Sequence, residues 1–147
     1  MPKLSDIVTK FDTARKAVGG VNSFLFDAAI SSMNADKEKE YPSMLFMPPF
    51  GNFSDADMTT KDYKIDFFLF DLWFPNSDGE TRTQQDVWQA LEDKAIAIVK
   101  LIDEDGPNYG LLNPTKEPVI VYSPYPMHND KLMGVKCSFN MRIFYGC

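Results

Sequence analysis

The sequence has little histidine and cysteine, the residue types that most often build metal and redox sites. Its one histidine is His128, in the segment Pro-Met-His-Asn-Asp, and its two cysteines are Cys137 and Cys147. A structural zinc site needs four ligands at characteristic spacings, and a disulfide scaffold needs several cysteine pairs. We therefore interpret His128 as part of an exposed turn, Cys137 as a small buried side chain and Cys147 as a free thiol. No metal or cofactor is expected.

The chain also lacks the motifs of nucleophilic and phosphate chemistry. Ser123 and Ser138 have no Gly-x-Ser-x-Gly context, and Gly19-Gly20 precede no Gly-Lys-Ser. These absences favour a protein that is not an enzyme.

Three carboxylates in one predicted strand, Asp62, Asp66 and Asp71, are the remaining candidates for catalysis. Glycoside-type hydrolysis needs two carboxylates that face one substrate, but Asp71 points away from the other two at a period of two residues. Carboxylates from other segments could complete such a pair, so a small hydrolase stays open as a distant alternative.

Long apolar runs and an excess of basic charge are missing as well. No run approaches the eighteen or so apolar residues that span a bilayer, and the first six residues, Met-Pro-Lys-Leu-Ser-Asp, lack an apolar signal region. Acidic residues outnumber basic ones by 21 to 15, a net charge of −6, whereas nucleic-acid binding depends on neutralising phosphates. We expect a chain made in the cytoplasm that binds neither membranes nor specific nucleic-acid sequences.

What the chain does have is an ordinary globular composition with many aromatic residues. Its 147 residues are 44% hydrophobic and 24% charged, which predicts a single domain over residues 1–147. Aromatic residues make up 14% and include twelve Phe. An aromatic core explains this content, and a repackable contact surface is the alternative.

The segment 61–74 predicts a central strand. Period-two spacing places Tyr63, Ile65, Phe67, Leu69 and Trp73 on one face. The other face begins with polar residues and continues with four large apolar ones, Phe68, Phe70, Leu72 and Phe74. Such a strand is covered on both faces at its end, so we expect helices on one face and a second sheet or another subunit on the other.

Helical spacing of apolar residues predicts two helices. Residues 4–18 carry one apolar stripe and precede Gly19-Gly20, which favour a helix end. Residues 82–104 carry the stronger stripe, and Thr83 with Asp86 resembles a capping box at its start.

Short strands are predicted over 22–27, 41–49 and 118–123, and a long amphipathic strand over 131–145. Pro48-Pro49 are expected to end one ladder, and 50–60 to form a long polar connection. The predicted fold is α+β, with two layers: a mostly antiparallel sheet of four to five strands and two helices on one face.

Several aromatic residues are candidates for an interface. Phe50 and Phe53 flank Asn52 among small polar residues, where a core would not recruit them. Phe68 and Phe70 occupy the second face of the central strand, and Tyr109 lies in the loop 107–117.

Three segments together resemble small neck proteins of tailed phages. They are the Tyr41-Pro42 strand ending in Pro-Pro, the aromatic strand 63–74 with its Trp-Phe-Pro exit, and the closing strand that begins Asp-Lys-Leu-Met-Gly-Val-Lys-Cys-Ser-Phe at Asp130. The order of elements is similar to that of the tail-terminator-like head–tail connectors, which include neck ring proteins of crAss-like gut phages.

This resemblance implies a structural protein of the virion. It implies a cyclic homo-oligomer around the DNA channel, in contact with a portal or head-completion protein on one side and the tail tube or other neck proteins on the other. It supplies no catalytic residues. The alternative is a non-enzymatic adaptor or a small-ligand-binding α+β domain, which would be a monomer or dimer.

Overall fold

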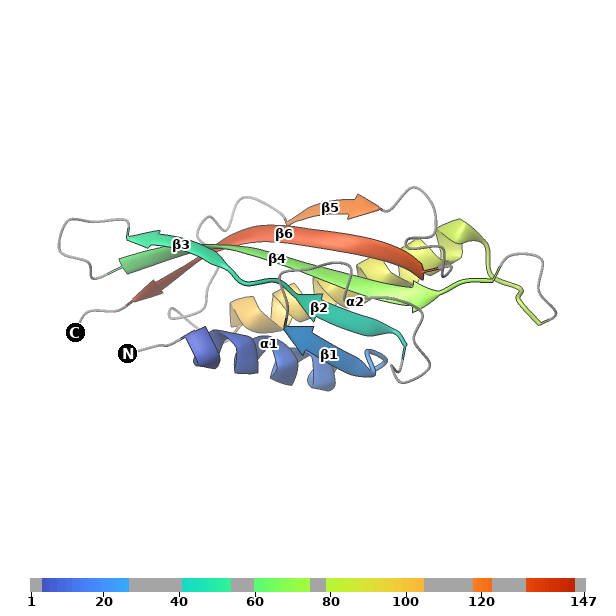
Figure 1. Ribbon diagram of the computed structural model, residues 1–147, viewed down its shortest axis with the longest axis horizontal. Helices are drawn as coiled ribbons and strands as arrows, with labels where there is room; N and C mark the ends of the chain where they lie inside the picture. The colour runs from blue at the N-terminus through green and yellow to red at the C-terminus, as the bar shows by residue number, and fades with distance from the viewer. Residues whose placement is uncertain are drawn as a thin grey trace.

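The computed structural model of the chain describes residues 4–26, 41–53, 60–74, 79–104, 118–122 and 132–144. Two helices and six strands lie within these residues (Figure 1). In chain order they are α1 Leu4–Val18, β1 Ser23–Phe26, β2 Ser43–Phe46, β3 Phe50–Phe53, β4 Thr60–Leu72, α2 Gln84–Glu104, β5 Val119–Tyr122 and β6 Leu132–Phe144. The five predicted strands and both predicted helices are present, and α2 begins two residues later than predicted. His128, Tyr109 and Cys147 lie outside the described residues.

The strands form one sheet in the order β1-β2-β4-β6-β5, and β3 pairs with β4 beside this path. β1 runs parallel to β2, whereas the other pairings are antiparallel. Both helices lie against one face of the sheet (Figure 1). The predicted two-layer α+β fold with a mostly antiparallel sheet is therefore confirmed.

The additional strand, β3, corrects the expectation that 50–60 is a loop throughout. β2 pairs with residues 67–70 of β4, and β3 pairs with residues 61–64 along the same side of that strand. The prolines at 48 and 49, which have no N–H to donate, separate the two pairings. They interrupt the ladder but do not end it, because the long β4 offers a free length of edge beyond β2.

The main core lies between the helices and one face of the sheet. Tyr63, Ile65, Phe67 and Leu69 of β4 are buried there with alternate residues of β6 and the apolar stripes of both helices. The Phe11 ring of α1 is 4.6 Å from the Phe46 ring and 5.9 Å from the Phe67 ring, measured between centroids. The period-two alternation predicted for β4 is thus confirmed.

The second face of the sheet is also buried at its centre, which corrects a prediction. Leu45, Phe68 and Phe70 form a smaller apolar cluster on this face, and Phe70 has no exposed surface while Phe68 exposes 9%. The Phe68 and Phe70 rings stack with 5.4 Å between centroids. We expected a second sheet or another subunit to cover these rings. They are instead buried within the single chain, so Phe68 and Phe70 are core residues and not an exposed interface.

Two glycines let aromatic rings lie flat across neighbouring strands. Gly134 of β6 is paired with Phe70, and a Cβ atom at this position would lie 2.7 Å from the Phe70 ring. Gly51 of β3 is paired with Tyr63, whose ring would be equally close to a Cβ atom there. Contacts this short are sterically forbidden, so glycine is required wherever the ring cannot move.

Local signals at the helix ends act as the sequence predicted. The Asp86 carboxylate accepts a hydrogen bond of 2.8 Å from the backbone N–H of Thr83, and the Thr83 hydroxyl accepts one of 3.2 Å from the N–H of Asp86. This is a capping box at the start of α2. Gly19 and Gly20 have φ angles of 79° and 76° after the end of α1, a left-handed conformation that glycine adopts without strain.

Candidate interaction surface

The large apolar side chains that remain exposed gather at the two edges of the sheet. Six such side chains are exposed among the described residues, and four of them lie in the edge strands: Phe26 in β1, and Val119, Val121 and Tyr122 in β5. The other two are Leu4 and Phe74. Since β1 and β5 are the first and last strands in the sheet order, the exposed apolar surface is divided between opposite sides of the molecule (Figure 1).

The β5 edge, defined as Val119–Tyr122, exposes apolar side chains in alternation. Val119 and Val121 are 60% and 52% exposed and point to the face without helices, whereas Ile120 packs on the main core. Tyr122 is 41% exposed, and its ring lies 5.6 Å from that of Trp88 in α2. Pro118, which has no N–H, immediately precedes the strand.

Two charged residues lie beside this edge: Lys136 of β6 is paired with Val121 on the face without helices, and Glu92 of α2 lies on the helix-covered side. Glu92 forms a hydrogen bond with the Tyr122 hydroxyl, which raises the pKa of Tyr122 above its ordinary value. The carboxylate accepts a hydrogen bond from the phenolic O–H and so favours the neutral form of the tyrosine. The β5 edge therefore combines an uncharged strand with an acidic side chain on its helix-covered side.

The β1 edge, defined as Ser23–Phe26, has the same kind of strand beside a different helix. Phe24 and Phe26 stack on Phe46 with 6.3 and 5.9 Å between ring centroids, and Phe26 is still 39% exposed. The Arg15 guanidinium of α1 lies 5.9 Å from the Phe24 ring and donates a 3.0 Å hydrogen bond to the Val21 carbonyl. The helix beside the β1 edge, α1, thus places the positively charged side chain of Arg15 next to it.

None of the six predicted interface residues belongs to either edge. Phe50, Asn52 and Phe53 lie in β3, opposite Lys64, Asp62 and Lys61 of β4. Phe68 and Phe70 are buried, and Tyr109 is outside the described residues. The β1 and β5 edges were not predicted as interfaces, because a short strand of apolar residues is usually part of a buried core. The available signal was the absence of any charged residue in 22–26 and 118–123.

The three carboxylates of β4 each have a separate partner. Asp62 pairs with Arg142 at 2.9 Å, and Asp66 accepts a 2.5 Å hydrogen bond from the Ser138 hydroxyl, both across the β4–β6 ladder. Asp71 pairs with Arg82 at 3.0 Å. The two cross-strand pairs, Asp62 with Arg142 and Asp66 with Ser138, help to fix the register of the β4–β6 ladder. Their geometry fits a structural role for these carboxylates.

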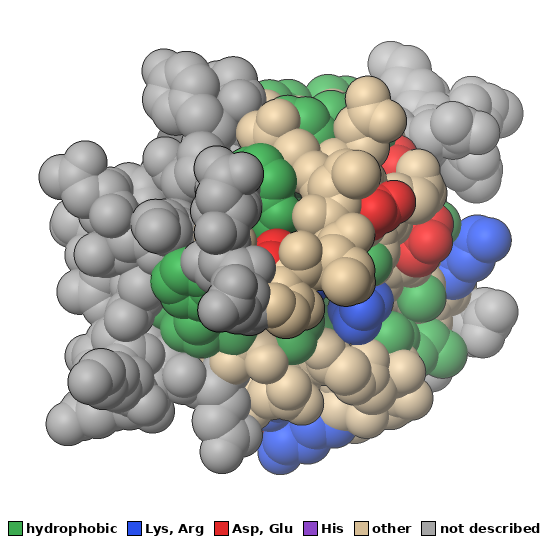
Figure 2. Space-filling view, turned by 90° about the vertical axis from the view of Figure 1, so that its right-hand side faces the viewer, with side chains coloured by type: hydrophobic (Ala, Val, Ile, Leu, Met, Phe, Trp, Pro, Cys, Tyr) green, Lys and Arg blue, Asp and Glu red, His purple; other side chains and the backbone are tan. Residues whose placement is uncertain are grey.

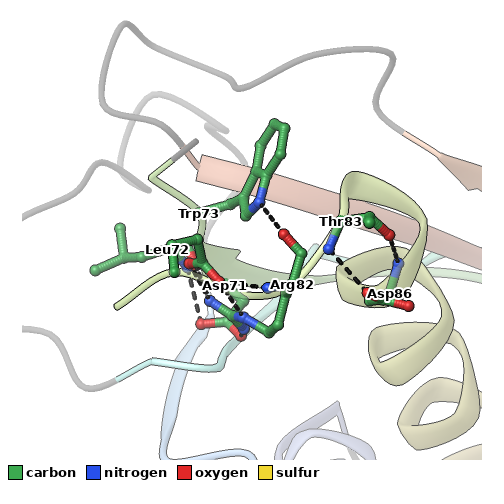
Figure 3. A network of polar contacts seen from close by, with 7 residues as sticks. Asp71, Leu72, Trp73, Arg82, Thr83 and Asp86 are labelled. Carbon is green, nitrogen blue, oxygen red and sulfur yellow. Dashed lines mark hydrogen bonds and ion pairs between the residues drawn. The ribbon is translucent and has the colours of Figure 1, made fainter. Parts of the chain in front are cut away.

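Arg82 joins the end of β4 to the start of α2 (Figure 3). Its guanidinium donates hydrogen bonds to the carboxylates of Asp71 and Glu80, at 3.0 Å each, and to the Leu72 carbonyl at 2.9 Å. Its own carbonyl accepts a 3.0 Å bond from the Trp73 indole. Figure 2 shows this end of the molecule, where acidic and basic side chains lie close together on the surface. The cluster orients α2 relative to the sheet.

The Arg82 cluster predicts a pH-dependent contribution to stability. Hydrogen bonds from the Arg82 side chain and backbone lower the pKa of Glu80 from 4.5 to about 2. A carboxylate whose pKa is lower in the folded state stabilises that state above the unfolded pKa, and the contribution disappears as the pH falls toward the folded pKa. We expect Glu80→Gln to lower the urea midpoint at pH 6 and to have a much smaller effect near pH 2. In an Arg82→Ala background the same substitution should have little effect at either pH. An effect of Glu80→Gln that does not change with pH would contradict this assignment.

Other kinds of site have little support in the described part of the chain. No group of three or more His, Cys, Asp or Glu residues is placed there to hold a metal ion. No helix there is long and apolar enough to cross a membrane. A depression of about 410 Å³ lies against α2, and its described lining residues are Gln89, Glu92, Asp93, Ile96, Ala97 and Lys100.

Comparisons with known proteins identified no relative of the chain. No family model matches it, and no curated protein matches it at a significant level.

Proposed function

We propose that the chain is a structural virion protein that forms a cyclic homo-oligomer at the head–tail junction of a tailed phage. The observation that carries the proposal is the pair of exposed apolar edges on opposite sides of one sheet. Two different patches on opposite sides of a subunit allow head-to-tail contacts between identical copies. Such heterologous contacts form a ring when the rotation between subunits closes.

The phage assignment is supported by the order of elements. The resemblance to tail-terminator-like connectors depends on a helix, a short strand, two strands, a long helix and two closing strands. The chain has this order, with β3 added between the two middle strands. In such a ring the neighbours along the channel are a portal or head-completion protein and the tail tube or another neck protein.

The charge of the chain is compatible with a DNA conduit. With a net charge of −6, the protein has no general excess of cations to retain DNA phosphates. DNA can pass through a channel only where the wall does not bind it strongly. The role proposed is mechanical, with no substrate turned over.

The decisive experiment locates the protein in its native setting. Mass spectrometry of purified particles from the phage that encodes the chain should detect it in a fixed number of copies per particle. Particles made without it should accumulate as separate heads and tails in electron micrographs. If the protein were absent from particles, and particles made without it still joined heads to tails, the proposal would be wrong.

The alternative, a free-standing adaptor or small-ligand-binding domain, makes a different prediction for the purified protein. An adaptor should remain a monomer or dimer and bind a peptide or ligand. A ring component should be found as a higher, closed oligomer. Light scattering coupled to size exclusion, followed by negative-stain imaging, distinguishes the two.

A further inference from the structure

We propose that the subunits join through their sheets: β5 of one copy pairs antiparallel with β1 of the next copy. This inference rests on the proposed self-association and names the surfaces that carry it. It extends the six-stranded sheet of one subunit into a sheet that continues around the ring.

Strand directions make such a junction antiparallel. Along the order β1-β2-β4-β6-β5, the first pairing is parallel and the next three are antiparallel. β1 therefore runs opposite to β5, as the arrows in Figure 1 show. When copies stand side by side with their strands aligned, β5 of one copy meets β1 of the next in opposite directions. An antiparallel pair of this kind has hydrogen bonds perpendicular to the strands.

The side chains of the two strands match when they pair in this way. Each strand has four residues, Ser-Phe-Leu-Phe in β1 and Val-Ile-Val-Tyr in β5, and neither contains a charge. On the helix-covered face, Phe26 and Tyr122 come to the same side of the junction; on the other face, Leu25 joins the two exposed valines. Pairing thus covers apolar surface on both faces of the junction without burying a charge.

The helices beside the two edges carry charges of opposite sign. At the β1 edge, Arg15 and Lys16 both pair with Asp12, which leaves one positive charge in excess. At the β5 edge, the carboxylate of Glu92 lies against Tyr122. Because α1 flanks β1 and α2 flanks β5, the junction brings an acidic flank to a basic one. Complementary charges of this kind direct association and fix its register.

Exposed edge strands are a hazard that proteins normally reduce with charged side chains, proline or a covering segment. The strands β1 and β5 have no charged side chain, and the valines of β5 are more than half exposed. The outer backbone groups of every second residue in an edge strand point away from the sheet. Because β1 and β5 end the sheet order within the described residues, a partner strand can add hydrogen bonds and apolar cover along both of them.

Cysteine cross-linking tests the junction directly. In a Cys147→Ser background, Leu25→Cys would be combined with Val119→Cys in one variant and with Val121→Cys in another, because these positions share a face. We expect one of these double variants to give a ladder of covalent oligomers on mild oxidation or with a short bis-maleimide. Cys137 should not contribute, since burial raises the pKa of its thiol to about 12.

Matched controls separate this junction from other contacts. Tyr122→Cys with Leu25→Cys places the thiols on opposite faces of the junction and should not cross-link. Val121→Cys alone should give no covalent dimer, whereas a mixture of the two single variants should. A covalent dimer from Val121→Cys alone would indicate that two β5 strands pair with each other, which contradicts the inference.

A charge substitution gives an independent readout. Val121→Lys adds a charge at an exposed position, so the circular dichroism spectrum of the folded subunit should not change, while oligomers should be lost. Ala90→Lys, at an exposed position of α2, should leave assembly intact. If Val121→Lys still formed oligomers and neither cysteine double variant cross-linked, the proposed β5–β1 junction would be wrong. Ring formation itself would not be contradicted by that result. A protein that is monomeric at every concentration and never cross-links would contradict both.

Discussion

Leu91→Asp and Leu69→Asp are each expected to unfold the domain. Leu91 in α2 and Leu69 in β4 are buried on opposite sides of the main core, with almost no exposed surface. A carboxylate buried there without a partner costs several kcal/mol, and the unfolding free energy of a domain this size is about 5–15 kcal/mol. Both variants should lose their cooperative thermal transition by circular dichroism or melt far below the wild type.

The control for these substitutions is Ala90→Asp, which adds the same charge one residue away on the exposed side of α2. A surface change of this kind is expected to alter stability by less than about 0.5 kcal/mol. If Leu91→Asp and Leu69→Asp folded with the melting temperature of Ala90→Asp, the helix-covered face of the sheet would not be the core.

Gly134→Ala is expected to destabilise the fold although it adds a single methyl group. The added Cβ atom would lie 2.7 Å from the ring of Phe70, and Phe70 is fully buried against Leu45 and Phe68. The ring can therefore make room only by disturbing the second apolar cluster. Overpacking of this kind costs about 1–3 kcal/mol, which corresponds to a fall of roughly 2–12 °C in melting temperature for a chain of this length.

A double-mutant cycle with Phe70→Leu tests the cause. The shorter leucine removes the ring that the new methyl group would meet, so Gly134→Ala should cost less in the Phe70→Leu background. Residues in direct contact usually show coupling energies of about 0.5–3 kcal/mol, well above the error of chemical unfolding experiments. Strictly additive effects would show that Phe70 does not restrict position 134.

The burial of Phe68 and Phe70 changes the reason for expecting self-association. The sequence suggested that a second sheet or another subunit covers the far face of β4, but the single chain already buries the centre of that face. The apolar surface that stays exposed lies at the edges of the sheet, and it includes Val119 and Val121 of the outer strand β5. Association through edges extends the sheet, whereas association through faces would have stacked two sheets.

Elements whose residues follow one local period could be predicted from the sequence. The alternation from Tyr63 to Leu69, the apolar stripe of α2 and the capping pair of Thr83 and Asp86 depend on neighbours within a few residues. Spacing alone therefore predicted which face of β4 meets the helices, the start of α2 to within two residues and the two-layer α+β fold.

The tertiary structure decided the features that depend on distant pairings. The strand β3 forms only because the long β4 provides an edge beyond β2, and β1 becomes an outermost strand because β2 pairs with it on one side and with β4 on the other. Gly134 matters because Phe70, sixty-four positions earlier, lies across it. In the same way, the uncharged strands at 23–26 and 119–122 become a candidate interface only when the sheet order places them at its two edges. Local periodicity fixes the direction of a side chain, but strand order depends on contacts between segments that are far apart in the chain.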